Sequence, residues 1–249
     1  MKYFIGHLLF IFIALNTKAE TIIIKGDEWC PFNCQPNANN KGYMIDLAKI
    51  IFERKGHNID YQIDSWTNSI KTVRDGKATA IVAANLFDAP DFIFPMNSMG
   101  VSRDCFFINK NDQWEYNSKN QLANRSLGVV ESYAYSRSIN DFIKENQNNI
   151  TKAQGDKAIL NLMENLEQKK INTIVENPIV FNYYQQQKYK EMHFVEAGCA
   201  DTTELFIAFS PKNPRSKEFA KILSDGIEEL RKDGTLQKII KKYSLQEWQ

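Results

Sequence analysis

The sequence predicts an α/β protein made of two similar lobes. The main observation is a unit that occurs twice, about 90 residues apart, and consists of an amphipathic helix, a polar corner and a short buried strand. Its first copy runs from Ile70 to a strand at 78–83, and its second from Leu160 to a strand at 172–175. A chain of 249 residues is also long enough to give each lobe a core of its own.

The chain begins with a pattern typical of a secretory signal peptide. Lys2 precedes an apolar run at 3–15, and small residues follow up to Ala19, where we expect cleavage. A membrane anchor is the alternative, but this run is shorter than the roughly 20 apolar residues that span a bilayer. We therefore expect residues 1–19 to be removed on export, with no membrane insertion of the remaining chain.

The charge balance argues against two classes of partner. Removal of 1–19 takes away Lys2 and Lys18 from 31 basic side chains and leaves all 30 acidic ones, so the mature chain is nearly neutral. Such a chain has no general electrostatic attraction for nucleic acid or for an anionic membrane surface. We expect neither partner.

Aromatic residues gather in the first part of the mature chain. A β-rich run at 21–24 leads to a loop with Trp29 and Phe32, and an amphipathic helix follows from Tyr43, with apolar positions 44, 47, 48, 51 and 52 on one face. Pockets for small ligands are lined mostly by apolar and aromatic side chains. We expect these three aromatic residues and Trp66 to contact a ligand. Core packing is the alternative, most of all for Phe32 and Tyr43.

Polar residues follow the strands of the repeated unit. Asn85 and Glu176 come after them, and ligands of open α/β sheets gather beyond the carboxyl ends of the strands. We expect a further strand at 126–130 and then a helix with Ser132 as its N-cap, whose first N–H groups would face an anionic group. Asp156 is expected to favour the start of the next helix through the helix dipole, and a cleft contact is the alternative.

All four cysteines, Cys30, Cys34, Cys105 and Cys199, lie in the exported part. An even number in an oxidising compartment favours disulfides, although four cysteines allow three pairings. Pairing of Cys30 with Cys34 would brace the aromatic loop, and Cys105 with Cys199 would then join two segments that each precede a strand.

A redox or metal site is the alternative for the cysteines. His57 and His193 lie in unrelated sequence contexts, and Cys30 and Cys34 are separated by three residues instead of the two of a thioredoxin-like motif. We expect structural disulfides, no metal and no cofactor.

The order of these features resembles the bacterial periplasmic solute-binding proteins of family 3, the polar amino-acid type. The segments that carry the resemblance are 29–32, 42–52, 66, 73–82, 89–95, 230–236 and 242–248, and together they cover nearly the whole mature chain. The resemblance implies the type II two-lobed fold, in which each lobe is a mixed β-sheet flanked by helices and two crossing segments join the lobes. It implies lobe 1 at 20–108 and 201–249, lobe 2 at 109–200, and a periplasmic location.

The resemblance also assigns roles to several residues. In that family, aromatic residues near the positions of Trp29 and Trp66 lie against the ligand's side chain, and an acid at the position of Glu176 pairs with the ligand's α-amino group through charge-assisted hydrogen bonds. The family's Arg, which grips the α-carboxylate, is missing here, because its position falls near Asp88 or Ala89.

Two further features bear on the ligand's charge. Arg103 is a candidate for the missing cation, with an ordinary surface position as the alternative. Glu131, Ser132 and Tyr133 stand where the family has small residues, and an acid with an aromatic residue favours a cationic or amine ligand. The missing Arg puts an ordinary α-amino acid ligand in doubt.

The resemblance implies a monomeric binding protein, not an enzyme, that captures a small polar, nitrogen-containing solute and delivers it to an ABC permease. A ligand-sensing module for a membrane sensor is one alternative. Another is an enzyme similar to cyclohexadienyl dehydratases, with Glu176 and Tyr133 as acid and base. The enzyme is disfavoured because its carboxylate substrate would need the missing Arg, and the sequence shows no Ser-His-Asp, Cys-His or metal-ligand constellation.

Overall fold

The computed structural model describes residues 19–155, 157–189, 191 and 193–248. The expected signal peptide at 1–19, apart from Ala19, and Asp156 lie outside the described residues. Within the described ranges, none of the helices combines the length and the apolar character that a membrane crossing requires.

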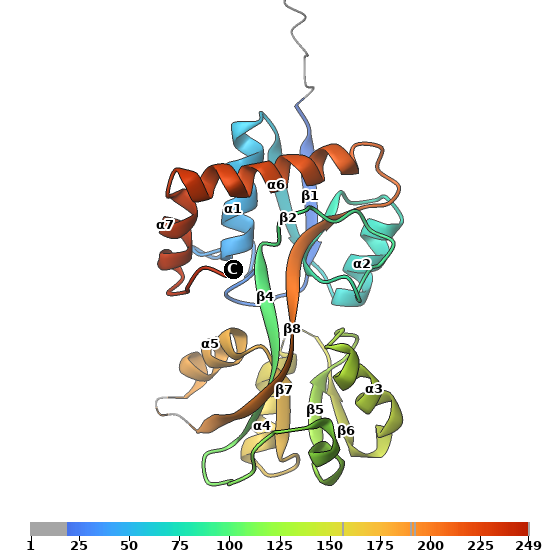
Figure 1. Ribbon diagram of the computed structural model, residues 1–249, viewed down its shortest axis with the longest axis vertical. Helices are drawn as coiled ribbons and strands as arrows, with labels where there is room; N and C mark the ends of the chain where they lie inside the picture. Colours follow the sequence, from blue (N-terminus) through green and yellow to red (C-terminus); the bar gives the residue numbers. More distant parts are fainter. Residues whose placement is uncertain (1–18, 156, 190, 192, 249) are drawn as a thin grey trace, which may run out of the picture.

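Two α/β lobes lie one above the other, and the long strands β4 (Gly100–Asn109) and β8 (Phe194–Phe209) run through both of them (Figure 1). The upper lobe, lobe 1, contains β1 (Thr21–Gly26), α1 (Tyr43–Arg54), β2 (Asn58–Ile63), α2 (Trp66–Arg74), β3 (Ala80–Ala84), α6 (Ser216–Lys232) and α7 (Thr235–Lys242). The lower lobe, lobe 2, contains the 3-10 helix η1 (Lys119–Asn124), β5 (Leu127–Val130), α3 (Arg137–Glu145), the 3-10 helix η2 (Gln147–Asn149), β6 (Ile150–Ala153), α4 (Ala158–Glu167), β7 (Thr173–Glu176) and α5 (Pro178–Lys188).

The strands form one mixed sheet in the order β2-β1-β3-β8-β4-β7-β5-β6. In lobe 1, β1 pairs in parallel with β2 and β3, and in lobe 2, β5 pairs in parallel with β6 and β7. The crossing strands β4 and β8 are antiparallel to each other, and each is antiparallel to one strand of a lobe. The predicted α/β architecture, two lobes joined by two crossing segments, is confirmed.

The repeated unit of the sequence is present in both lobes. In lobe 1, α2 leads through a corner to β3, and in lobe 2, α4 leads to β7. Strand β7 is buried along its whole length, so its last side chain, Glu176, is delivered into the interior between the lobes. Asn177 then caps α5, because its side chain accepts the N–H of Ile179 at 2.8 Å, and Pro178 occupies the first turn.

The first helix buries the apolar face that its spacing predicts, with the members of that face at Met44, Leu47, Ala48, Ile51 and Phe52. It begins after Gly42, whose φ of 102° is in the region that favours glycine. A Cβ at Gly42 would collide with the carbonyl oxygen of Phe32 and the backbone of Asn33. This glycine therefore allows the aromatic loop to pack directly against the start of α1.

The prediction of a helix with Ser132 as its N-cap is wrong. Helix α3 begins at Arg137 with Ser136 at the N-cap position, and Ser132 lies in a turn with a φ of 67°. The side chain of Asp104 accepts the N–H of Ser136 at 2.6 Å, which holds the start of the helix at that residue. Ser132 therefore offers no helix N-terminus to an anion.

Disulfides join Cys30 to Cys34 and Cys105 to Cys199, so the expected structural disulfides are confirmed. The first closes the loop that carries Trp29. The second lies inside the crossing strands rather than before them, at a place where Cys105 is also in register with Glu176 of β7. The second disulfide thus joins β4 to β8 next to the site residue Glu176.

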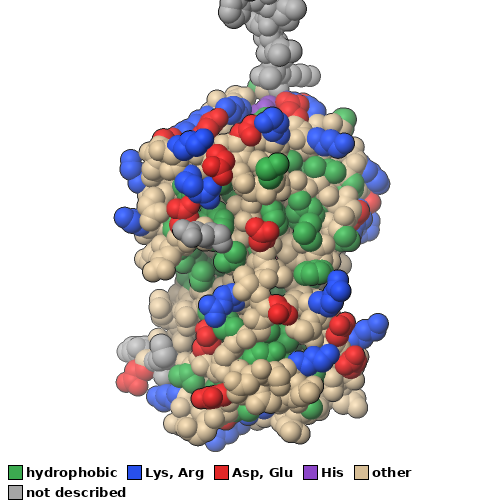
Figure 2. All heavy atoms as spheres, in the orientation of Figure 1, with side chains coloured by type: hydrophobic (Ala, Val, Ile, Leu, Met, Phe, Trp, Pro, Cys, Tyr) green, Lys and Arg blue, Asp and Glu red, His purple; other side chains and the backbone are tan. Residues whose placement is uncertain are grey.

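Acidic and basic side chains are interspersed over the face of both lobes that Figure 2 shows, without a large area of one sign. This distribution agrees with the nearly neutral charge balance of the sequence.

Candidate functional site

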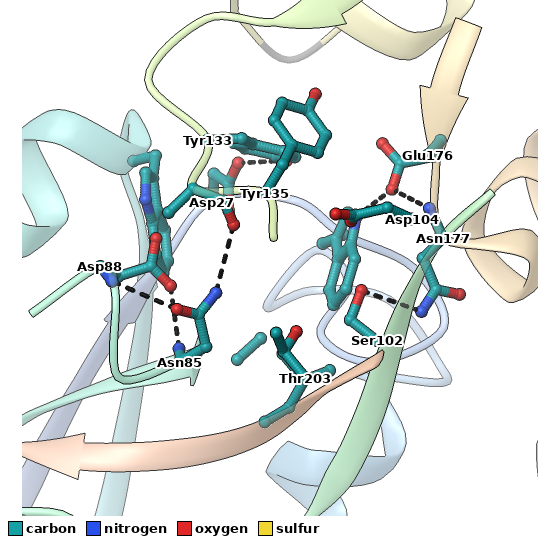
Figure 3. Close-up of a pocket in the computed structure, with 15 residues that line it drawn as sticks. Asp27, Asn85, Asp88, Ser102, Asp104, Tyr133, Tyr135, Glu176, Asn177 and Thr203 are labelled. Carbon is teal, nitrogen blue, oxygen red and sulfur yellow. Dashed lines mark hydrogen bonds between the residues drawn. The ribbon is translucent and has the colours of Figure 1, made fainter. Parts of the chain in front are cut away.

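The described residues of both lobes line two neighbouring cavities. The inner chamber has a volume of about 50 Å³, and the outer chamber a volume of about 410 Å³. Asp27, Trp66 and Tyr133 line both chambers and therefore form the partition between them. Residues of both lobes and of the crossing strands surround the inner chamber (Figure 3).

Lobe 1 contributes the turn after β3 to the inner chamber. The side-chain oxygen of Asn85 accepts the N–H of Phe87 at 2.7 Å and of Asp88 at 3.2 Å, and the Asp88 carboxylate accepts the N–H of Asn85 at 2.8 Å. These reciprocal bonds hold both side chains at the chamber wall. Burial raises the pKa of Asp88 to about 7, against the lowering effect of its hydrogen bonds.

Lobe 2 contributes Glu176 at the end of β7, which is 2% exposed. Its Oε1 accepts the indole N–H of Trp29 at 3.1 Å and the backbone N–H of Asn177 at 2.7 Å. Its Oε2 is buried and has no hydrogen-bond partner among the described residues. Burial raises the pKa of Glu176 to about 8, and the charges of Asp104 and Asp27 add to this effect.

Several hydrogen bonds among the described residues cross from one lobe to the other. Besides Trp29 to Glu176, the hydroxyl of Tyr133 donates to the Asp27 carboxylate at 2.7 Å, and the side-chain amide of Asn85 donates to the carbonyl of Ala134 at 3.2 Å. The structure is therefore a closed arrangement of the two lobes, in which both make direct contact around the inner chamber.

The chambers are acidic. Asp27, Asp88, Asp104 and Glu176 line the inner one, and Glu28 and Glu131 line the outer one. Among the described residues that line either chamber there is no Lys, Arg or His. Burial also raises the pKa of Asp104. The site therefore offers hydrogen-bond acceptors and negative charge, and no cationic side chain to hold an anion.

The structure brings together five of the residues that the sequence indicates: Trp29, Trp66, Asn85, Tyr133 and Glu176 all line the inner chamber. Ser132 lines the outer chamber instead.

Three of the expected site residues lie away from the inner chamber. Phe32 and Tyr43 are buried in the core of lobe 1, where the ring of Phe32 stacks on Trp29 with centroids 4.5 Å apart and Tyr43 packs behind Phe32 at 5.2 Å. They support the wall that Trp29 forms. Arg103 is exposed on β4, with its guanidinium 3.0 Å from the sulfur of Cys199.

Sequence reasoning missed Asp27, Asp104 and Tyr135, and it noted Asp88 only as the place of a missing Arg. A signal for Asp27 exists, because it directly follows β1 in the way that Glu176 ends β7. Asp104 gives no such signal, since it lies within the long strand β4.

Replacing Tyr133 with Phe is expected to weaken the closed arrangement. The change removes the hydroxyl that donates to the Asp27 carboxylate, and a hydrogen bond to a charged group contributes about 1.5–3 kcal/mol. Small-angle scattering of the ligand-free protein should show a larger radius of gyration. Tyr135→Phe is the matched control, because the Tyr135 hydroxyl accepts the N–H of Val130 within lobe 2, and its loss should leave the radius unchanged. Equal radii for both variants would contradict the prediction.

Comparisons with known proteins agree with this architecture. No family model matches the chain. The chain is similar to a probable histidine-binding protein of Campylobacter jejuni, with 24% identity in an alignment that covers 96% of this chain and 94% of that protein.

The solved structures that are similar along nearly their whole length include the following two. One is a histidine kinase sensor domain with similarity to periplasmic binding proteins, at a TM-score of 0.74 and 15% identity, covering 90% of this chain and 95% of that one. The other is an ancestral arginine-binding protein bound to arginine, at a TM-score of 0.71 and 19% identity, covering 90% and 97%. The chain has the type II two-lobed fold, and its predicted resemblance to amino-acid solute-binding proteins is confirmed.

Proposed function

We propose that the protein is a periplasmic solute-binding protein that captures a small polar, nitrogen-containing ligand between its lobes and delivers it to an ABC permease. The observation that carries the proposal is the buried Oε2 of Glu176, which lacks a hydrogen-bond partner among the described residues and belongs to a chamber built by both lobes. A ligand with an N–H group supplies that partner. Buried polar groups are normally hydrogen-bonded, so the ligand would favour the closed state over the open one.

Closure of the two lobes is then the change that the permease recognises. A ligand that contacts both lobes binds the closed state more tightly, and this difference in affinity shifts the population. The similarity to the histidine-binding and arginine-binding proteins supports a nitrogen-containing ligand. We also propose that the chain is exported with cleavage after Ala19 and that it is monomeric. The proposed lobe boundaries lie at 108–109 and 200–201.

A second function is favoured by one comparison. The similarity to a histidine kinase sensor domain supports a role in reporting the ligand to a membrane sensor. The same cleft and the same closure would serve it, because a sensor and a permease both respond to the closed state.

We infer that the protein is not an enzyme. The similar proteins are named as binding proteins or sensors, and Tyr133, the candidate acid or base, holds its proton in a bond to Asp27. Burial raises the pKa of Tyr133 well above its usual range, which opposes a role as a base. Incubation of the purified protein with prephenate or arogenate should leave both unchanged.

Thermal unfolding of residues 20–249 tests the binding function. A ligand that binds only the folded protein stabilises it by about 2.7 kcal/mol at 100 times its Kd. We expect amino acids or amines to raise the Tm and to reduce the radius of gyration in solution. If no nitrogen-containing compound at millimolar concentration changes either quantity, or if dicarboxylates alone do so, the proposal is wrong.

A further inference from the structure

We propose that the ligand is a small organic amine without a carboxylate group, and that an α,ω-diamine fits best, with one ammonium group at Glu176 and the other at Asp88. This inference rests on the proposed function and names the class of ligand. It differs from the amino acids that the similar binding proteins are named for.

The first argument is the acceptor at Glu176. Its Oε2 is the free oxygen of a carboxyl group that is 2% exposed, while Oε1 is already occupied by Trp29 and Asn177. An ammonium group donates up to three hydrogen bonds and carries the charge that a buried carboxylate needs. The structure thus leaves one buried carboxylate oxygen of Glu176 as an acceptor for a cationic nitrogen.

The second argument is the absence of a place for an anion. A ligand carboxylate in the inner chamber would lie among the side chains of Asp27, Asp88, Asp104 and Glu176. Two like charges 4 Å apart repel by about 4 kcal/mol near a protein surface. The described lining of both chambers offers no Lys, Arg or His to offset this repulsion.

The third argument is that acidic groups lie on two opposite sides. In Figure 3, Asp88 lies beside Asn85 on the lobe 1 side of the chamber, and Glu176 lies across it beside Asp104 and Asn177. A cation at one side leaves the carboxyl group of the other side without a cationic partner. A molecule with an ammonium group at each end satisfies both.

The fourth argument is the size of the chamber and the character of its walls. Trp29, Trp66 and Tyr133 line the chamber, and aromatic faces attract cations and pack against CH₂ groups. The volume of about 50 Å³ is small, since one water molecule needs roughly 10–15 Å³. The small volume favours a ligand with few heavy atoms, as a short diamine is.

Isothermal titration calorimetry on residues 20–249 at pH 8 tests the inference with matched ligands. L-lysine and 1,5-diaminopentane differ only by the carboxylate, and butylamine and 1,4-diaminobutane differ only by the second ammonium group. We expect 1,5-diaminopentane to bind at least tenfold more tightly than lysine, and 1,4-diaminobutane at least tenfold more tightly than butylamine. Asp88→Asn should weaken diamine binding about tenfold or more and change butylamine binding less than threefold.

The outcomes separate the two proposals. If lysine, arginine or histidine binds as tightly as the diamines or more tightly, the amine inference is wrong and the solute-binding function stands. If a monoamine matches its diamine and Asp88→Asn changes nothing, the second ammonium position is wrong. If no nitrogen-containing compound binds the folded protein, both proposals are wrong.

Discussion

Glu176→Gln is expected to weaken binding of an amine ligand roughly 100-fold, which corresponds to about 3 kcal/mol. Glutamine retains the oxygen that accepts the N–H groups of Trp29 and Asn177, so the local structure is kept. It places an NH₂ group at the position of Oε2, the oxygen that has no hydrogen-bond partner among the described residues, and a donor there repels the N–H groups of the ligand. The negative charge is lost as well.

Calorimetric titration at pH 8 measures this loss, and thermal unfolding shows that the variant is folded. Glu164→Gln is the matched control, because it removes one negative charge from an exposed position of α4, where Glu164 pairs with Lys188. The control should bind within threefold of the unmodified protein. An unchanged affinity of Glu176→Gln would show that the ligand does not use this carboxylate.

The ligand-free protein should lose stability as the pH rises from about 5 to 8. Burial raises the pKa of Glu176 from 4.5 to about 8 and that of Asp88 from 3.8 to about 7, so the closed protein binds more protons than the unfolded chain in this range. The free energy of unfolding therefore falls as these groups ionise. For Glu176 the full loss of unfolding free energy is on the order of 5 kcal/mol, and any opening of the lobes that returns water to the carboxylate reduces it.

The groups that face Glu176 reinforce this dependence. Asp104 lies on β4, Asp27 follows β1, and Tyr133 and Tyr135 come from the segment after β5, and none of these four supplies a positive charge. A saturating amine should abolish the loss, because an ammonium group stabilises the ionised carboxylates. Chemical denaturation at several pH values, with and without 1,5-diaminopentane, measures both effects. The double variant Glu176→Gln and Asp88→Asn should show a flatter profile, and a slope equal to that of the unmodified protein would contradict the assignment.

The elements were predictable where one residue pattern determines them. The apolar face of α1, the buried strand β7 and the helix-corner-strand units each follow from local spacing. The start of α3 was not predictable, because the side chain that holds it belongs to Asp104, which is 32 residues before Ser136 in the sequence. Local propensity at Ser132 gives no information on such a distant anchor.

The sequence indicated single residues of the site, each within its own segment, but not how these segments meet. Glu176 and Trp29 each carry a local signal, the end of a buried strand and an aromatic loop, but the hydrogen bond between them spans 147 positions. The acidic character of the chamber emerges only when the turn after β3, the strand β4 and the end of β7 meet. An isolated acid such as Asp88 in a sequence is ordinarily read as a solvated surface residue.

The paired crossing strands determine what kind of motion the lobes can make. Ladder hydrogen bonds and the disulfide between Cys105 and Cys199 prevent β4 from sliding along β8, whereas a two-stranded ribbon still bends and twists. Lobe 2 leaves and rejoins lobe 1 through this ribbon, so the lobes move relative to each other by bending and twisting it and not by sliding. A protein docked on both lobes would therefore sense occupancy as a change in the angle between them, whatever the chemical identity of the ligand.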